Sequence, residues 1–118
     1  MDERVQAAAS LMHKSFEREL SVGDMARAVN LSPSHFSHLF KAEIGVSPLQ
    51  YLKSLRMRKA KELLDTTFLN VKQVMNRVGV KDKCNFARDF KKAYGLTPAR
   101  YKAHRKHGQT VEAGFTTK

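Results

Sequence analysis

The sequence carries one pattern of structural residues twice, and this internal repeat limits the available folds more than any other feature. The first copy runs from Ser21 to Tyr51 and the second from Asn70 to Tyr101. The copies are offset by 49 residues in their first half and by 50 in their second, with one extra residue near Lys81. A nearly constant offset of this kind predicts two structural units of the same design.

Each copy of the pattern begins with a short helix that ends in a tight turn. Capping pairs, in which a small polar residue precedes an acidic or amide residue by three positions, mark the two starts. These pairs are Ser21 with Asp24 and Asn70 with Gln73. Asn30 and Gly79 follow the two helices, and both residue types tolerate the left-handed backbone conformation that a tight turn requires. We therefore expect helices over 21–29 and 70–78, each followed by a turn.

A second helix follows each turn, and both copies end it in the same way. Ser32-Pro33 and Asp82 are favourable starting caps, and two phenylalanines four positions apart predict the buried face of each helix. The phenylalanine pairs are Phe36 with Phe40 and Phe86 with Phe90. Each copy then closes with the string Gly-x-(Ser/Thr)-Pro-x-x-Tyr, which ends one helix at Gly45 or Gly95 and starts the next.

Apolar spacing completes the expected fold, because no segment shows convincing β-alternation. Further helices are expected over 3–19, 48–65 and 98–107. We predict an all-α chain of seven helices in which two helix-turn-helix subdomains are joined by a long linker helix. The expected divisions are the subdomains 1–47 and 67–107, the linker 48–66 and a disordered tail at 108–118. The alternative for each unit is an αα-hairpin that serves packing alone.

The charge of the chain favours a polyanionic partner. The net charge is +11, with −1 in residues 1–50 and +12 in residues 51–118. A basic surface attracts nucleic acid and anionic membranes alike, and it also occurs on proteins that bind neither. No apolar run approaches the roughly 20 residues that span a bilayer, and Met1 to Arg4 do not begin a signal peptide. Cys84 is the sole cysteine, so a reducing, cytoplasmic location is expected.

The string from Asn85 to Tyr101 combines an aromatic residue, Phe-Lys, Gly-x-(Ser/Thr)-Pro and a final Tyr. It resembles the DNA-binding domain of the AraC/XylS family of bacterial transcription regulators, and the resemblance runs from about Val5 to Arg105. The first copy and the linker match as well, through Leu31-Ser32, Phe36, Leu39-Phe40-Lys41, Gly45-Val46-Ser47-Pro48, Tyr51, Arg56, Ala60, Leu63 and Leu64. Val74-Met75 and Gly79-Val80 replace the usual Ile-Ala and Gly-Phe but keep an apolar side chain.

The resemblance implies a homeodomain-like, AraC-type fold that presents two recognition helices to double-stranded DNA. In a helix-turn-helix unit, the second helix enters the major groove. A linker of about 18 residues is about 27 Å long, and successive major-groove segments lie about 34 Å apart. We therefore expect sequence-specific DNA binding in transcription regulation, with the two recognition helices in successive major-groove segments.

Residues that contact DNA are expected on the outer faces of the two recognition helices. The resemblance assigns base reading to Ser34, Ser37, His38, Lys83, Cys84 and Arg88, and the helix face adds Asn85. Arg88 is the strongest candidate, because arginine can donate two hydrogen bonds to guanine. Basic side chains and helix N-termini suit phosphate. The phosphate candidates are Lys41, Lys53, Lys91, Lys92, Arg100 and Lys102, with the caps Ser21, Ser47, Asn70 and Thr97.

Competing functions have less support from the residues. A basic helical adaptor for protein partners and the targeting domain of a DNA enzyme are the two alternatives. No cysteine or carboxylate completes a ligand set beside the pairs His35/His38 and His104/His107, so neither a metal nor another cofactor is expected. No glycine-rich phosphate loop or nucleophile–base–acid signature indicates an enzyme. RNA polymerase and a separate sensor or dimerisation domain, which this chain lacks, are potential partners beside DNA.

Overall fold

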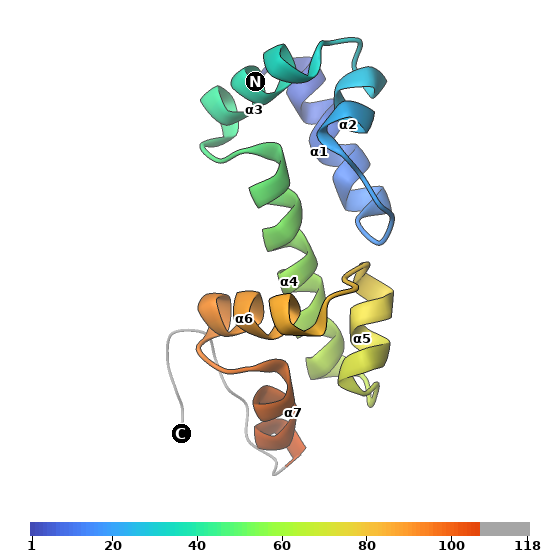
Figure 1. The fold of residues 1–118 in the computed structure, drawn as a ribbon, viewed down its shortest axis with the longest axis vertical. Helices are drawn as coiled ribbons and strands as arrows, with labels where there is room; N and C mark the ends of the chain where they lie inside the picture. Colours follow the sequence, from blue (N-terminus) through green and yellow to red (C-terminus); the bar gives the residue numbers. More distant parts are fainter. Residues whose placement is uncertain (107–118) are drawn as a thin grey trace. The chain divides into compact units, whose positions relative to one another are not determined.

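The computed structural model describes residues 1–106, which fold into helices and contain no strand (Figure 1). The elements are α1 (Glu3–Ser15), α2 (Val22–Ala28), α3 (Pro33–Ile44), α4 (Pro48–Thr66), α5 (Val71–Val78), α6 (Lys83–Tyr94) and α7 (Pro98–Lys106). Within residues 1–106, the prediction of an all-α fold with seven helices is confirmed. The expected tail at 108–118 and the expected helix end at His107 lie outside the described residues.

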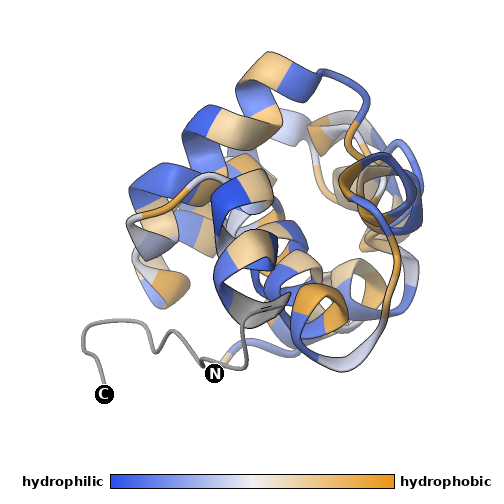
Figure 2. Ribbon diagram, turned by 90° about the horizontal axis from the view of Figure 1, so that it is seen from below, coloured by the Kyte–Doolittle hydropathy of each residue, from blue (hydrophilic) through white to orange (hydrophobic). Residues whose placement is uncertain are grey.

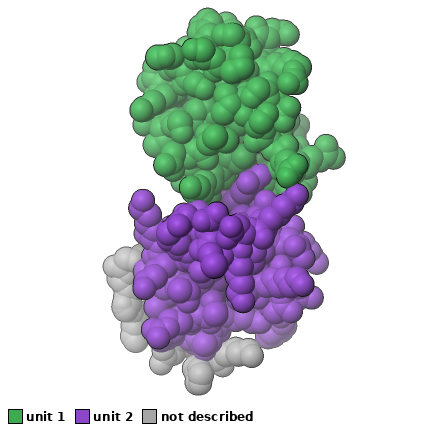
Figure 3. Space-filling model, viewed as in Figure 1, with its two compact units in different colours: residues 1–55 green, residues 56–118 purple. Residues whose placement is uncertain are grey.

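The chain divides into two compact units, here called unit 1 (Met1–Leu55) and unit 2 (from Arg56 onward) (Figure 3). The boundary falls inside α4, so one continuous helix contributes its first half to unit 1 and its second half to unit 2. The predicted linker, residues 48–66, spans this boundary. Leu52 and Leu55 of α4 belong to the core of unit 1.

The core of unit 1 is formed by the apolar stripes of its helices. Hydrophobic and hydrophilic residues alternate along the helices (Figure 2), which gives each helix one face to bury. Helix α2 packs against both α1 and α3. The buried side chains are Val5, Ala8, Met12, Met25, Ala26, Phe36, Phe40, Leu52 and Leu55. Full burial of a Leu or Phe side chain stabilises by about 1.5–3 kcal/mol, which allows a helix as short as α2 to persist.

Unit 2 repeats this arrangement with its own core. Helix α6 packs against α5 and α7, and the second half of α4 completes the unit. The buried side chains are Met57, Ala60, Leu64, Val74, Met75, Val78, Phe86, Phe90 and Tyr101. Each unit therefore has a separate set of buried apolar residues.

The two predicted left-handed turns are confirmed, and they share one hydrogen-bond pattern. Asn30 has a φ of 61° and Gly79 a φ of 80°. In each unit, the N–H of the next residue donates to the carbonyl oxygen five residues earlier. These bonds run from Leu31 to Ala26 at 2.9 Å and from Val80 to Met75 at 3.0 Å. This is the Schellman type of helix end, which satisfies the last carbonyl groups of the first helix and turns the chain sharply.

The predicted helix starts are also confirmed. The Ser21 hydroxyl accepts from the backbone N–H of Asp24 at 3.0 Å, and the Asp24 carboxylate accepts from the N–H of Ser21 at 3.1 Å. Asn70 and Gln73 make the same two reciprocal bonds at 2.8 and 2.9 Å. The side chains of Ser32 and Asp82 cap α3 and α6. Each cap satisfies backbone donors that a helix start otherwise leaves without partners.

The duplication extends further toward the N-terminus than the sequence pattern indicated. Three buried residues of α1 have counterparts with the same spacing in the second half of α4. The pairs are Val5 with Met57, Ala8 with Ala60 and Met12 with Leu64. Here the offset is 52 residues, whereas it is 49 at the capping boxes, because the segment from Leu64 to the cap Asn70 is three residues shorter than the segment from Met12 to the cap Ser21. The second half of α4 therefore has the same role in unit 2 as α1 has in unit 1.

The expected bounds of the first helix need correction. Apolar spacing predicted a helix over 3–19, but α1 ends at Ser15. The N–H of Arg18 donates to the carbonyl oxygen of Ser15 at 3.0 Å and closes a four-residue turn over 15–18. Phe16 and Leu20 still pack against the core of unit 1, but they do so from this loop. Apolar residues therefore continue past the end of α1, because the loop after it also packs against the core.

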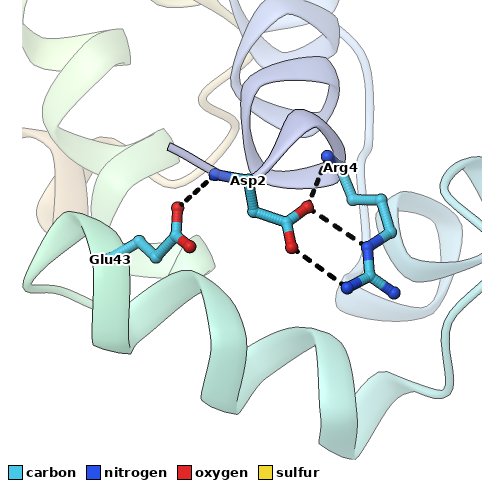
Figure 4. Close-up of polar contacts among 3 residues, drawn as sticks. All are labelled: Asp2, Arg4 and Glu43. Carbon is cyan, nitrogen blue, oxygen red and sulfur yellow. Dashed lines mark hydrogen bonds and ion pairs between the residues drawn. The ribbon is translucent and has the colours of Figure 1, made fainter.

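A small polar cluster fixes the start of α1 (Figure 4). The carboxylate of Asp2 accepts from the backbone N–H of Arg4 at 2.7 Å and pairs with the Arg4 guanidinium at 3.0 Å. The backbone N–H of Asp2 donates to the Glu43 carboxylate of α3 at 2.9 Å. Hydrogen bonds from the Arg4 side chain and then from its backbone lower the pKa of Asp2 from 3.8 to about 2.

Acidification toward pH 2 is expected to remove the contribution of the Asp2 carboxylate to the stability of unit 1. Because the pKa of this group is lower in the folded state, its contribution is fully present above the unfolded value of 3.8 and is lost as the pH falls through about 2. Asp2→Ala should therefore destabilise unit 1 at pH 7 but much less at pH 2, as measured by urea unfolding. An equal deficit at both pH values would contradict a role for the carboxylate charge.

Candidate nucleic-acid interface

Helices α3 and α6 expose and bury the same positions. Residues 33–48 and 83–98 share one order of buried, half-buried and exposed side chains, except at Val46 and Leu96. Val46 is exposed, whereas Leu96 is half-buried. Both helices thus present one outer face of equivalent positions, which is the arrangement expected of two units that act in the same way.

Aromatic packing holds the inner face of each of these helices. In unit 1, the ring of Phe40 lies 5.7 Å from that of Phe36 and 5.5 Å from that of Tyr51, between ring centroids. In unit 2, the ring of Phe90 lies 6.0 Å from Phe86 and 5.7 Å from Tyr101. Edge and tilted contacts at these distances are favourable beyond the area they bury. They fix which side of α3 and α6 points outward.

The two tyrosines also tie the helix after α3 or α6 back to the first helix of the same unit. The Tyr51 hydroxyl lies 3.0 Å from Nε2 of His13 in α1. The Tyr101 hydroxyl donates to Asp65 of α4, which also pairs with Lys61 at 3.1 Å. Burial and the hydrogen bond to Asp65 raise the pKa of Tyr101 to about 12, so this hydroxyl keeps its proton at neutral pH. His13 and Asp65 occupy equivalent positions, and the sequence analysis singled out neither.

The outer face of α3 carries the residues that the sequence assigned to it. Ser34, His38 and Lys41 are exposed and Ser37 is half-buried. Ser37, His38 and Lys41 border a shallow hollow of about 430 Å³, together with Ala42 and Ser47. Four of the predicted DNA contacts, Ser37, His38, Lys41 and Ser47, therefore border one depression.

The outer face of α6 is fully accessible. Lys83, Cys84, Asn85, Arg88 and Lys91 are all exposed. The Arg88 guanidinium donates from Nη2 to the side-chain oxygen of Asn85, one turn earlier. Sequence reasoning placed both residues on this face but did not foresee their hydrogen bond.

The predicted phosphate contacts fall into two groups. Among the basic side chains, those of Lys41, Lys53, Lys91, Lys92 and Arg100 are exposed and that of Lys102 is half-buried. Among the caps, Ser47 and Thr97 are half-buried and accept backbone hydrogen bonds at 3.3 Å from Gln50 and Arg100. At Ser21, the Asp24 carboxylate already accepts the backbone N–H, whereas the equivalent bond at Asn70 is to the neutral Gln73. The start of α2 in unit 1 therefore carries the negative charge of Asp24, whereas the start of α5 in unit 2 carries only the neutral amide of Gln73.

The two outer helices differ strongly in charge. Helix α3 has one lysine and one glutamate, whereas α6 has four basic residues and a single aspartate. The positive charge of α6 comes from Lys83, Arg88, Lys91 and Lys92. Because opposite charges attract before any close contact forms, α6 is the stronger electrostatic partner for a polyanion.

Over the part of the chain that the structure describes, His, Cys and carboxylate groups form no cluster of three that could hold a metal ion. Within the same range, no helix has the length and apolar character required to cross a membrane. The exposed chemistry of the outer helices consists of hydroxyl, amide, imidazole, thiol, ammonium and guanidinium groups, with the carboxylate of Glu43 near the end of α3. Most of these groups can donate hydrogen bonds, which suits the acceptors of DNA bases and phosphates.

Two units, each with a short helix, a left-handed turn and an exposed second helix, define a double helix-turn-helix domain. In this class of protein, the exposed second helix is the element that enters the major groove of DNA. The comparison with known proteins assigns the chain to a particular family within this class. A family model described as "Helix-turn-helix domain" matches residues 25–104. The chain belongs to the AraC family of helix-turn-helix DNA-binding domains.

Relatives of known sequence or structure agree with this assignment. The C-terminal domain of AraT, a response regulator from Geobacillus stearothermophilus, is 30% identical, with a TM-score of 0.82 over 99% of this chain and 94% of that one. The arabinose operon regulatory protein of Escherichia coli is 36% identical over 87% of this chain, and the lactose operon transcription activator of Staphylococcus xylosus is 32% identical over 88%. This chain covers 36% and 37% of the lengths of those two relatives, which are transcription regulators and not enzymes.

Proposed function

We propose that α3 and α6 are recognition helices and that each occupies its own major-groove segment in a target site of defined sequence. The matching outer faces of the two helices carry this proposal, because both are polar and accessible while both inner faces are buried. The side chains proposed to contact bases are Ser34, Ser37 and His38 of α3 and Lys83, Cys84, Asn85 and Arg88 of α6. The major groove of DNA accommodates an α-helix, and polar side chains in the N-terminal half of that helix can reach the base edges.

Phosphate contacts are proposed to come from the basic residues that flank the recognition helices. Lys41, Lys91 and Lys92 lie on those helices, and Lys53, Arg100 and Lys102 lie on the helix that follows each of them. The caps Ser47, Asn70 and Thr97 add backbone donors, which suit anions. Ser21 has less support than the others, since Asp24 beside it repels a phosphate. These contacts set the position of the protein, whereas base contacts set the sequence it selects.

The regulatory setting is proposed from the relatives. The two curated relatives described above are regulators of sugar operons, and this chain covers only 36% and 37% of their lengths. We therefore propose that the domain works in the bacterial cytoplasm, where it controls transcription together with a sensor or dimerisation domain and with RNA polymerase.

A salt titration of DNA binding tests the proposed function directly. If about 6–8 phosphates are neutralised, a plot of log affinity against log salt concentration should have a slope of about −5 to −7. A fluorescent duplex, selected from random DNA by its affinity for the protein, provides the probe for anisotropy measurements. The double variant Lys91→Ala/Lys92→Ala should reduce the steepness by about 2, because each lysine accounts for about one phosphate.

Lys14→Ala is the matched control for this titration, because Lys14 is an exposed lysine of α1 outside the proposed interface. Its slope should equal that of the unaltered protein. A slope near zero for the unaltered protein, or an equal loss in the control, would contradict the proposed phosphate contacts.

The single cysteine offers an independent test of the α6 interface. Cys84 is exposed in the second position of α6, so it should react readily with a maleimide in the unbound protein. Target DNA should slow this reaction in proportion to the fraction of protein that is bound, because only unbound protein exposes Cys84 to the reagent. Mass spectrometry measures the rate, and 1 M salt, which screens phosphate contacts, should restore it.

A cysteine moved to α1 serves as the control for the labelling experiment. The variant Lys14→Cys/Cys84→Ala should react at the same rate with and without DNA. Equal labelling of Cys84 in the free and DNA-bound protein would show that α6 does not face the duplex.

A further inference from the structure

Arg88 is not a freely moving side chain in the unbound protein. Its Nη2 donates to Oδ1 of Asn85 at 2.5 Å, and both residues lie on the exposed face of α6, one turn apart. An exposed arginine normally samples many rotamers and must give up that freedom on binding. The hydrogen bond restricts Arg88 before any DNA is present, which lowers the entropic cost of a later contact.

Asn85 is itself held firmly. Its backbone N–H donates to the carboxylate of Asp82 at 2.9 Å, and Asp82 is the N-cap of α6. Asp82, Asn85 and Arg88 thus form a row along the first two turns of the helix. The side chain that anchors Arg88 starts from a capped and ordered backbone position.

The hydrogen bond also changes what the pair can recognise. A free asparagine reads adenine by accepting from N6 and donating to N7, which requires its side-chain oxygen. In this structure that oxygen already accepts from Arg88, which leaves it one lone pair, and every other polar group on the two side chains is an N–H donor. Guanine presents two acceptors, O6 and N7, in the major groove, whereas adenine presents an amino group beside N7. A surface made of donors matches guanine and opposes adenine.

We propose that Asn85 is a positioning residue that acts through Arg88 and makes the pair select guanine over adenine at a single base. The inference rests on the proposed role of α6 as a recognition helix. Asn85, placed above among the side chains proposed to contact bases, then determines specificity through Arg88 and not through a base contact of its own. In unit 1 the equivalent positions hold His35 and His38, so the device belongs to unit 2 alone.

The test compares base preferences in a mutant cycle. Affinities of the unaltered protein, Asn85→Ala, Arg88→Ala and the double variant are measured by anisotropy on the selected duplex and on duplexes with each base pair replaced in turn. Asn85→Ala should reduce the preference for guanine about 3- to 10-fold, at the same base pair at which Arg88→Ala abolishes it. The double variant should be no less selective than Arg88→Ala, because Asn85 has no separate contribution.

Two further variants separate positioning from other roles. Asn85→Asp keeps an acceptor for Arg88 and should retain the preference for guanine, although its added negative charge lowers affinity for all sequences. His35→Ala, at the equivalent position of α3, should leave the preference at that base pair unchanged. All these positions are exposed, so circular dichroism should show an unaltered fold.

The possible results distinguish this inference from the proposed function. Additive losses at two different base pairs would overturn it, because Asn85 would then read its own base. An unchanged guanine preference in Asn85→Ala would also overturn it. If Arg88→Ala itself changed no base preference, the proposed recognition role of Arg88 would fail as well.

Discussion

Replacing Phe90 by alanine is expected to unfold unit 2 while unit 1 stays folded. Phe90 is fully buried, and its ring contacts those of Phe86, Tyr94 and Tyr101, at 5.0 Å between centroids in the case of Tyr94. Truncation of a buried phenylalanine costs about 3–5 kcal/mol. A core of this size supplies only about 3–5 kcal/mol of net stability. The loss is therefore comparable to the whole stability of the unit.

Hydrogen exchange followed by mass spectrometry can assign the effect to one unit. Amides of α5, α6 and α7 should lose protection in Phe90→Ala, whereas those of α1, α2 and α3 should keep it. The equivalent variant Phe40→Ala should give the opposite result, since Phe40 is also fully buried and contacts Phe36 and Tyr51. Loss of protection throughout residues 1–106 in both variants would show that the two cores are not independent.

Arg88→Ala is expected to weaken binding to the selected DNA site by about 1–3 kcal/mol, which is about 5- to 150-fold. The physical reason is that arginine can donate two parallel hydrogen bonds to O6 and N7 of guanine. Binding to unrelated duplex DNA should fall much less, because only the general charge attraction loses a contribution. The variant should also tolerate replacement of one particular base pair that the unaltered protein does not.

Lys92→Ala provides the comparison for this prediction. Lys92 is exposed on the same helix and is proposed to contact phosphate, so its loss should weaken binding to all sequences about equally. Competition experiments with specific and unrelated DNA measure the ratio directly. A uniform loss in Arg88→Ala, indistinguishable from that in Lys92→Ala, would remove Arg88 from the set of base-reading residues.

Much of the fold was predictable because it depends on local chemistry. The capping boxes at Ser21 and Asn70 and the left-handed turns at Asn30 and Gly79 follow from residue types that have few other uses at those positions. The buried phenylalanines were predictable as well, since their spacing matches one face of a helix. Such signals need only neighbouring residues, and all of them were confirmed.

The extent of the duplication was not predictable in the same way. The match between α1 and the second half of α4 consists of small and aliphatic residues that vary freely within a core, such as Val5 against Met57. A shorter loop also shifts the offset at this point, so a search at constant offset fails. The hydrogen bonds of Tyr51 and Tyr101 use unlike partners, His13 and Asp65, and only the packed structure reveals that the two are equivalent.

The candidate interface was predictable only in part. Helix periodicity indicated which residues of α3 and α6 point outward, and their exposure agrees with it. Periodicity does not determine side-chain rotamers, so it could not indicate that Arg88 bonds to Asn85. The role of each outward residue toward DNA remains a proposal that the experiments above address.

The two proposed recognition helices carry different residues at equivalent positions, which gives the protein a defined direction on its DNA site. Ser34 and His38 of α3 stand where α6 has Cys84 and Arg88, so the two proposed half-sites differ in sequence. A two-fold dimer on a palindrome reads identically from either strand. If α3 and α6 read DNA as proposed, this chain binds its site in one orientation only, and inverting the site within a promoter should reverse the direction in which the bound protein faces.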